Sequence, residues 1–142
     1  EGDFVDKEGN YIGRHKGIIN YTIGQRRGLG IPAASRLYVC EISPKTNTVV
    51  LGDNADLFSS ELEADSVNLI SVDNLSEPKR VTAKIRYRHK EQPATAWQTP
   101  DGILHVKFDE PQRAITKGQA VVMYDGDEVV GGGVIYKIYS QS

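Results

Sequence analysis

The residues with the clearest chemical potential lie in a glycine-rich stretch, residues 17–31, that ends in Gln25-Arg26-Arg27-Gly28-Leu29-Gly30-Ile31. It holds two adjacent arginines and no acidic residue, although the whole chain has a formal net charge of −2. Guanidinium groups bind anions, and so do free backbone amides beside glycines. We therefore interpret Arg26 and Arg27 as a candidate anion site. The alternative is a surface loop that carries two solvated arginines.

The local backbone around these arginines can also be predicted. Thr22 and Gln25 have the spacing of a capping box, which predicts a short helix or helical turn beginning at Thr22. Gly28 is expected to end that turn, because glycine adopts the left-handed conformation at a helix terminus without a steric penalty. Such a segment would present Arg26 and Arg27 to solvent.

A second group of basic residues lies further along the chain. Residues 53–77 contain seven acids and no Lys or Arg, whereas residues 79–92 contain six bases and one acid. In a strand over residues 80–88 the bases, with Arg86 and Arg88 among them, would share one face and Tyr87 the other. Same-face neighbours lie about 6.6 Å apart, close to the spacing of successive phosphates. The alternative is a solvated outer strand face.

Other candidate groups carry weaker signals. Cys40 is the single cysteine, which excludes an internal disulfide and a multi-thiol metal site, and its neighbours are those of a packed strand. The three histidines lie far apart, so no metal site is predicted. An independent small enzyme with His15 or His89 as base is a further hypothesis, but no nucleophile or carboxylate partner stands at a recognisable spacing.

Composition is that of an ordinary globular protein. Of the 142 residues, 39% are hydrophobic and 25% charged. No apolar run approaches the roughly 20 residues of a membrane-spanning helix, and with one cysteine a cytoplasmic setting is the simplest expectation. Because the chain begins at Glu1 without methionine, an excised fragment is also expected.

Short alternating segments separated by turn residues predict an all-β chain. We expect a small β module over residues 1–60 and a small antiparallel β-barrel over residues 61–142. The strand over 36–43 is apolar on both faces, which predicts a central strand, and polar residues 73–78 predict a loop and possible hinge. Gly131-Gly132-Gly133 predicts close backbone approach or a sharp bend in the barrel wall. The expected strands are 3–6, 11–15, 36–43, 48–52, 62–72, 80–88, 94–98, 103–108, 119–124 and 129–139.

Four stretches, in the same order, resemble the central and C-terminal β domains of the tRNA-specific 2-thiouridylases, the MnmA family. One stretch that closely resembles the family is Tyr21-Thr22-Ile23-Gly24-Gln25-Arg26-Arg27-Gly28-Leu29-Gly30. The others are Gly2-Asp3-Phe4-Val5 with Gly13-Arg14-His15-Lys16-Gly17, Arg86-Tyr87-Arg88, and Phe108-Asp109-Glu110-Pro111 with Gly118-Gln119 and Gly131-Gly132-Gly133. Departures are Leu37, in place of a common aromatic residue, and a shorter loop over residues 32–36.

The resemblance implies a tRNA-binding role and a fold. Arg86, Tyr87 and Gln119 correspond to positions that the family uses on tRNA, and Arg26, Arg27 and Arg88 are added from their own chemistry. The barrel is expected to resemble the second domain of elongation factor Tu. The partner would be the anticodon region of tRNA.

In this family the wobble uridine is converted to 2-thiouridine with ATP and a cysteine persulfide, in an N-terminal domain whose motif Ser-Gly-Gly-x-Asp-Ser is absent here. The chain is therefore expected to contain no catalytic residue and no cofactor, to be inactive alone, and to meet a sulfur-donor protein or cysteine desulfurase only through the full-length enzyme. The alternative is a non-enzymatic, translation-factor-like binding or interaction module.

Overall fold

The computed structural model describes residues 1–30, 37–85 and 90–139. The chain divides into two compact units, Glu1–Phe58 and Ser59–Ser142, and each is described by itself below. No helix among the described residues has the length and apolar character needed to cross a membrane.

The first unit is a four-stranded mixed sheet with the order β2-β1-β4-β3. Strands β1 and β4 pair in parallel at its centre, and the outer pairs are antiparallel. The sheet covers a small core that includes Phe4, Val39, Val49 and Leu51. The elements are β1 (Gly2–Val5), β2 (Tyr11–His15), the 3-10 helix η1 (Ile18–Asn20), β3 (Tyr38–Ser43), β4 (Thr48–Gly52) and the 3-10 helix η3 (Asn54–Leu57).

The hairpin between β1 and β2 confirms the first two expected strands. Its turn is held by Asp6, whose carboxylate accepts hydrogen bonds from the amides of Asn10 at 2.8 Å and Glu8 at 3.0 Å. These bonds, that from Asn10 first, hold the pKa of Asp6 below its usual value. Gly9 has a φ of 89°, the left-handed conformation that glycine adopts without a Cβ clash.

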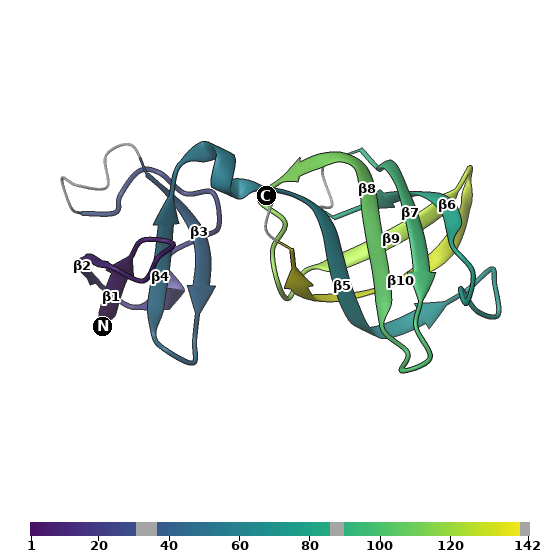
Figure 1. Cartoon of the computed structure of the whole chain (residues 1–142), viewed down its shortest axis with the longest axis horizontal. Coiled ribbons are helices and arrows are strands. Elements are labelled where there is room, and N and C mark those ends of the chain that lie inside the picture. Colours follow the sequence, from purple (N-terminus) through teal and green to yellow (C-terminus); the bar gives the residue numbers. More distant parts are fainter. Residues whose placement is uncertain (31–36, 86–89, 140–142) are drawn as a thin grey trace. The chain divides into compact units, whose positions relative to one another are not determined.

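Strand β3 is an edge strand, so the prediction of a central strand over residues 36–43 was wrong. A bulge falls between Val39 and Glu41, and Glu41 is exposed. The apolar composition misled because Val39 packs into the core, whereas Cys40 and Ile42 are only half-buried. Figure 1 shows β3 beside β4 at the margin of this sheet.

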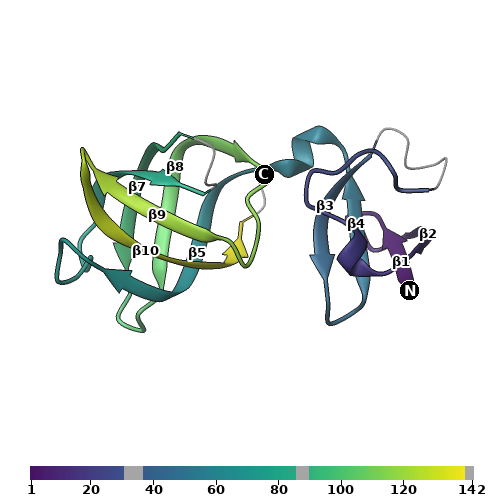
Figure 2. The ribbon, with the colours of Figure 1, turned by 180° about the vertical axis from the view of Figure 1, so that it is seen from behind.

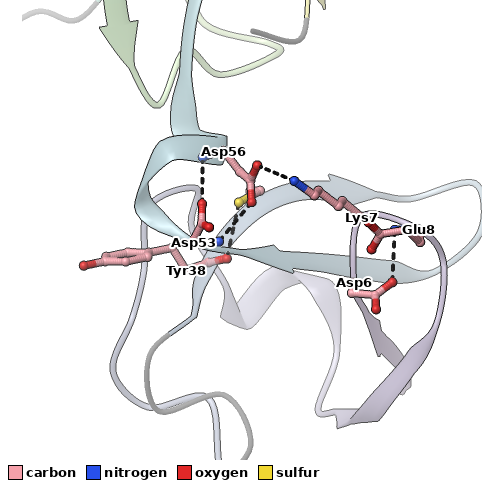
Figure 3. A network of polar contacts seen from close by, with 7 residues as sticks. Asp6, Lys7, Glu8, Tyr38, Asp53 and Asp56 are labelled. Carbon is pink, nitrogen blue, oxygen red and sulfur yellow. Dashed lines mark hydrogen bonds and ion pairs between the residues drawn. The ribbon is translucent and has the colours of Figure 1, made fainter. Parts of the chain in front are cut away.

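The 3-10 helix η3 is fixed at its N-terminus by a reciprocal cap. The Asp53 carboxylate accepts from the Asp56 amide at 3.3 Å, and the Asp56 carboxylate accepts from the Asp53 amide at 3.0 Å. Lys7, from the β1–β2 turn, donates to Asp56 at 3.1 Å (Figure 3). Burial raises the pKa of Asp56, but the hydrogen bonds from Lys7 and Asp53 outweigh it, so the net shift is downward.

The second unit is a closed barrel with the strand order β10-β5-β8-β7-β6-β9, so the all-β class and the barrel are confirmed. Figure 2 shows β9 and β10 side by side in the barrel wall, where they pair antiparallel. The strands are β5 (Phe58–Leu69), β6 (Lys79–Lys84), β7 (Gln92–Gln98), β8 (Leu104–Arg113), β9 (Ala120–Asp125) and β10 (Glu128–Ile138).

Small side chains allow this narrow barrel to close. Ala64, Ala83, Ala94 and Ala96 point inward and are at most 1% exposed, and they alternate along the walls with larger residues such as Leu104 and Met123. A six-stranded barrel has little interior volume, so its inward positions combine small and large residues to fill the space. The result is a packed core.

The glycine run in β10 confirms the predicted close approach. A Cβ at Gly133 would lie 2.7 Å from the carbonyl oxygen of Asp65, and one at Gly132 would collide with the carbonyl of Val121. Register shifts of β10 occur on both sides of this run. Missing side chains therefore let β10 bend between its two neighbours.

The loop over residues 73–78 is confirmed, but its expected freedom as a hinge is wrong. Leu75 is 3% exposed and belongs to the barrel core, and its carbonyl accepts from the Gln98 amide at 2.7 Å. Because its neighbours in the sequence are polar, Leu75 was not recognised as a core residue. This loop is thus fastened to the barrel.

Candidate nucleic-acid interface

The loop over residues 22–30, which we call the arginine loop, begins with a turn. The Gln25 amide donates to the Thr22 carbonyl at 3.0 Å, and Gly24 has a φ of 91° at the third position of the turn. A positive φ at this position is typical of a type II turn. The predicted short helix is absent here because glycine permits this tighter reversal, and Gly28 therefore ends no helix.

Gln25 organises the arginine loop through both its side chain and its backbone. Its side-chain oxygen accepts from the Thr22 amide at 3.0 Å, which is the half of the predicted capping box that forms. Its side-chain nitrogen donates to the Arg27 carbonyl at 2.9 Å. The Gln25 side chain therefore bonds to the backbone before Arg26, at Thr22, and after it, at Arg27.

The arginine loop is anchored at both ends. The Gly24 amide donates to the Val39 carbonyl at 2.7 Å and the Val39 amide donates to the Gln25 carbonyl at 2.8 Å, so the loop lies along the outer edge of β3. At the other end Leu29 is 5% exposed and packs into the core of the first unit. Arg26 and Arg27, between these anchors, are both exposed as predicted.

The two arginines differ in their surroundings. The Arg26 guanidinium carbon lies over the ring of Tyr38, 5.9 Å from its centroid. Figure 3 shows this ring directed away from the Lys7–Asp56 ion pair. A cation over an aromatic face is stabilised by the ring's quadrupole, so Tyr38 restrains Arg26. Sequence reasoning missed Tyr38 because it lies on β3, outside the loop.

Gln119 lies in the second unit, in the turn before β9. The turn is fixed by two backbone bonds to β10, in which the Gly118 amide donates to the Ile135 carbonyl at 2.8 Å and the Ile135 amide donates to the Gln119 carbonyl at 2.9 Å. Gly118 has a φ of 88°. Gln119 is exposed on this fixed turn, as an external contact requires.

The remaining predicted contacts, Arg86, Tyr87 and Arg88, lie outside the described residues. Strand β6 ends at Lys84, earlier than predicted, and over its length the expected alternation is confirmed, with Val81 and Ala83 buried. Arg80, on the predicted basic face, donates to both oxygens of Asp109 at 2.7 Å. This bond lowers the pKa of Asp109 and occupies the guanidinium of Arg80.

His15 and Cys40 have structural surroundings. His15 is 1% exposed; the Gly17 amide donates to its Nδ1 at 3.0 Å, so Nε2 carries the proton and donates to the Asn47 carbonyl at 2.8 Å. Cys40 is half-buried, and burial first, with Asp56 and Asp53 after it, raises its pKa to about 11. Neither group is placed as a base or nucleophile. His89 lies outside the described residues.

The barrel wall carries a polar cluster that sequence reasoning missed. Glu63 is 8% exposed and accepts from the hydroxyls of Tyr136, at 2.6 Å, and Tyr139. The bond to Glu63, followed by burial, raises the pKa of Tyr136 to about 12. His105 lies 4.0 Å from the carboxylate and stacks on Trp97. The cluster fastens the end of β10 to β5.

Two family profiles together cover most of the chain. The profile of the tRNA methyl transferase PRC-barrel domain matches residues 1–53, and that of the Aminomethyltransferase beta-barrel domain matches residues 59–135. A curated tRNA-specific 2-thiouridylase MnmA from Clostridioides difficile is 60% identical over 137 residues, which are 96% of this chain and 38% of that protein. The chain belongs to the MnmA family of tRNA-specific 2-thiouridylases.

Other curated MnmA proteins match this chain over a similar share of its length. The protein of the same name from Acetivibrio thermocellus is 56% identical over 94% of this chain and 37% of its own length, and that from Clostridium acetobutylicum is 54% identical over 94% and 38%. The MnmA-family chain thus spans little more than a third of the curated relatives it matches. The suggested family resemblance is confirmed over nearly the whole chain.

Proposed function

We propose that this MnmA-family chain binds tRNA for the 2-thiouridylase reaction and contributes no catalytic residue to it. The observation that carries the proposal is the arginine loop, in which Arg26 and Arg27 are exposed between two buried or hydrogen-bonded anchors. Fixed arginines beside positive-φ glycines suit phosphate groups of a folded RNA. The names of the relatives identify them as tRNA-specific.

The other proposed contacts are Gln119 on its fixed turn, and Arg86, Tyr87 and Arg88, by their correspondence to the family's motif. In this proposal the anticodon region of tRNA is the bound part. ATP and the sulfur donor act on the portion of the longer protein that this chain does not span, in the cytoplasm. The 142 residues alone bind tRNA and do not modify it.

The proposal is tested by titrating the chain against a fluorescently labelled, unmodified substrate tRNA at several salt concentrations. Because binding to phosphates releases counterions, the logarithm of the affinity is expected to fall linearly with the logarithm of the salt concentration. Arg26→Ala, Arg27→Ala and Arg86→Ala should each weaken binding by about tenfold, as expected for a hydrogen bond to a charged group.

The matched control is Lys45→Ala, which removes one exposed positive charge from the β3–β4 turn of the same unit. It should change the affinity by less than about twofold, because a single distant charge is screened. Absent or salt-insensitive binding would overturn the proposal and favour the protein-interaction module. Equal losses from Lys45→Ala and Arg27→Ala would show attraction to positive charge without a defined site.

A further inference from the structure

The 3-10 helix η1, which lies between β2 and the arginine loop, holds a large apolar side chain in solvent. Ile19 is 93% exposed, whereas its neighbour Ile18 packs against the core of the first unit. Ile19 therefore contributes almost no apolar burial to the fold. A single exposed isoleucine is common on protein surfaces, but Ile19 differs in the turn that carries it.

Polar side chains fix the backbone of this turn. The Gly17 amide donates to Nδ1 of His15 at 3.0 Å, and the Lys16 amide donates to the hydroxyl oxygen of Tyr21 at 3.0 Å. His15 and Tyr21 are only 1% and 9% exposed. The Asn20 side chain closes the turn by donating to the Lys16 carbonyl at 2.9 Å and to the Gly17 carbonyl at 3.3 Å. The position of η1 is therefore set before any ligand binds.

The charges near Ile19 in the sequence suit a polyanion. Residues 9–40, which we call the acid-free segment, contain five Lys and Arg and no Asp or Glu, in a chain whose net charge is −2. Lys16, before the turn, and Arg27, in the arginine loop, are both exposed. RNA combines phosphates, which attract positive charge, with apolar base faces that are unstacked in its loops. An exposed isoleucine within the acid-free segment fits this combination.

We propose that Ile19 contacts the face of an unpaired base in the bound tRNA, whereas the arginine loop contacts phosphates. This inference rests on the proposed function and adds to it an apolar contact directed at a base. Isoleucine is among the apolar side chains that nucleic-acid-binding proteins insert against bases. Because the turn is fixed in advance, little conformational entropy is lost on binding. Asn20 is then a positioning residue that acts through Ile19.

The first test separates an apolar contact from attraction to charge, by titrating labelled, unmodified substrate tRNA at several salt concentrations. Ile19→Ser should weaken binding about three- to tenfold, the effect of burying part of an isoleucine side chain. It should leave the slope of log affinity against log salt unchanged, because no counterion is involved. Arg27→Ala should instead reduce the magnitude of that slope by about 1. Ile19→Leu should stay within about twofold of the unaltered chain, because the apolar area is nearly kept.

The matched control is Ile70→Ser. Ile70 is 65% exposed, but it lies within residues 53–77, which contain seven acids and no Lys or Arg. The control should change the affinity by less than about twofold, as expected of an exposed residue away from the interface. The amide shifts of β4 should be the same in Ile19→Ser as in the unaltered chain, which establishes that the variant is folded.

The second test asks whether the turn acts through Ile19. Asn20→Ala removes both side-chain bonds that close the turn, so it should weaken tRNA binding about two- to fivefold. In the Ile19→Ser background the same change should have no further effect, because a base contact that is already lost cannot be mispositioned.

The outcomes separate this inference from the proposed function. Unchanged affinity in Ile19→Ser, or equal losses from Ile19→Ser and Ile70→Ser, would overturn the base contact while tRNA binding stands. Additive losses from Asn20→Ala and Ile19→Ser would overturn the positioning role of Asn20. If the unaltered chain does not bind tRNA, the proposed function is overturned and this inference with it.

Discussion

Arg26 and Arg80 show how neighbouring structure decides what an arginine can do. Arg80 gives both arms of its guanidinium to Asp109, at 2.7 Å each, and so is committed within the barrel. Arg26 is exposed, and its guanidinium carbon lies over the ring of Tyr38, 5.9 Å from the ring centroid. The number of basic residues in a segment therefore overstates the charge that it offers to RNA, because some bases are already paired.

Cys40 gives a prediction at the residue scale. Burial, with Asp56 and Asp53, raises its pKa to about 11 from an ordinary value of 9.0. Since only the thiolate reacts, alkylation by iodoacetamide at pH 8 should be about 100-fold slower in the folded chain than in the chain unfolded in urea. The rate in the folded chain should rise with a midpoint near pH 11.

The sign for stability follows from the same shift. Because the pKa of Cys40 is raised on folding, the folded chain binds the thiol proton more tightly than the unfolded chain does. The protonated thiol therefore stabilises the fold, and this contribution is complete below pH 9 and is lost as the pH rises towards 11. Asp56→Asn should lower the midpoint only in part, because burial is the larger cause. A midpoint near pH 9 in the folded chain would contradict this account.

At the scale of elements, the strands that were predicted well are those in which the alternation of apolar and polar residues and the flanking turn residues indicate the same bounds. Strand β4 has the predicted bounds, and the β1–β2 hairpin follows its turn residues. Strand β8 was predicted over residues 103–108, but it begins at Leu104 and continues to Arg113. Local composition does not reveal which strand lies at the edge of a sheet, and for this reason β3 was wrongly predicted to be a central strand.

Strand β10 provides a prediction for an element. Gly132→Ala would place a methyl group against the Val121 carbonyl of the neighbouring strand, and backbone cannot move aside cheaply. The variant should be about 1–3 kcal/mol less stable, the usual effect of overpacking. The measurement is the urea midpoint, followed by the fluorescence of Trp97, the single tryptophan, which lies in the barrel.

The control for this variant is Val129→Ala, at a position of the same strand that is 37% exposed. Its midpoint should change little, because an exposed side chain loses few contacts. A midpoint for Gly132→Ala equal to that of the control would mean that the glycine run is not needed for strand packing.

At the scale of the whole molecule, the sequence predicted the all-β class and the barrel but only part of the candidate site. The exposure of Arg26, Arg27 and Gln119 agrees with expectation. The contact between Tyr38 and Arg26 could not be predicted, because the two residues are 12 positions apart and only the fold brings them together. Long-range pairing of this kind leaves no local pattern.

The two units have separate cores, which predicts separable stability. His15 is buried in the first unit and bonds to the Asn47 carbonyl. His15→Leu would leave that carbonyl without its donor and should destabilise the first unit by about 1–3 kcal/mol. Hydrogen exchange of the Val49 and Leu51 amides should accelerate, whereas the urea midpoint of Trp97 fluorescence should stay unchanged.

Tyr11→Leu, at an exposed position of β2, is the control and should alter neither signal. If His15→Leu shifted both signals equally, the two units would unfold as one cooperative body, and separate cores would not imply separate folding.

The contact between the arginine loop and β3 has one more consequence. The amide and carbonyl of Val39 point out of the sheet, and Gly24 and Gln25 occupy both. An unpaired sheet margin is a template on which other chains add strands, and natural proteins cover or interrupt such margins. The arginine loop, which is proposed to bind RNA, therefore also covers the edge of β3 and limits self-association. Substitutions that break its bonds to Val39 should promote aggregation even where no RNA is present.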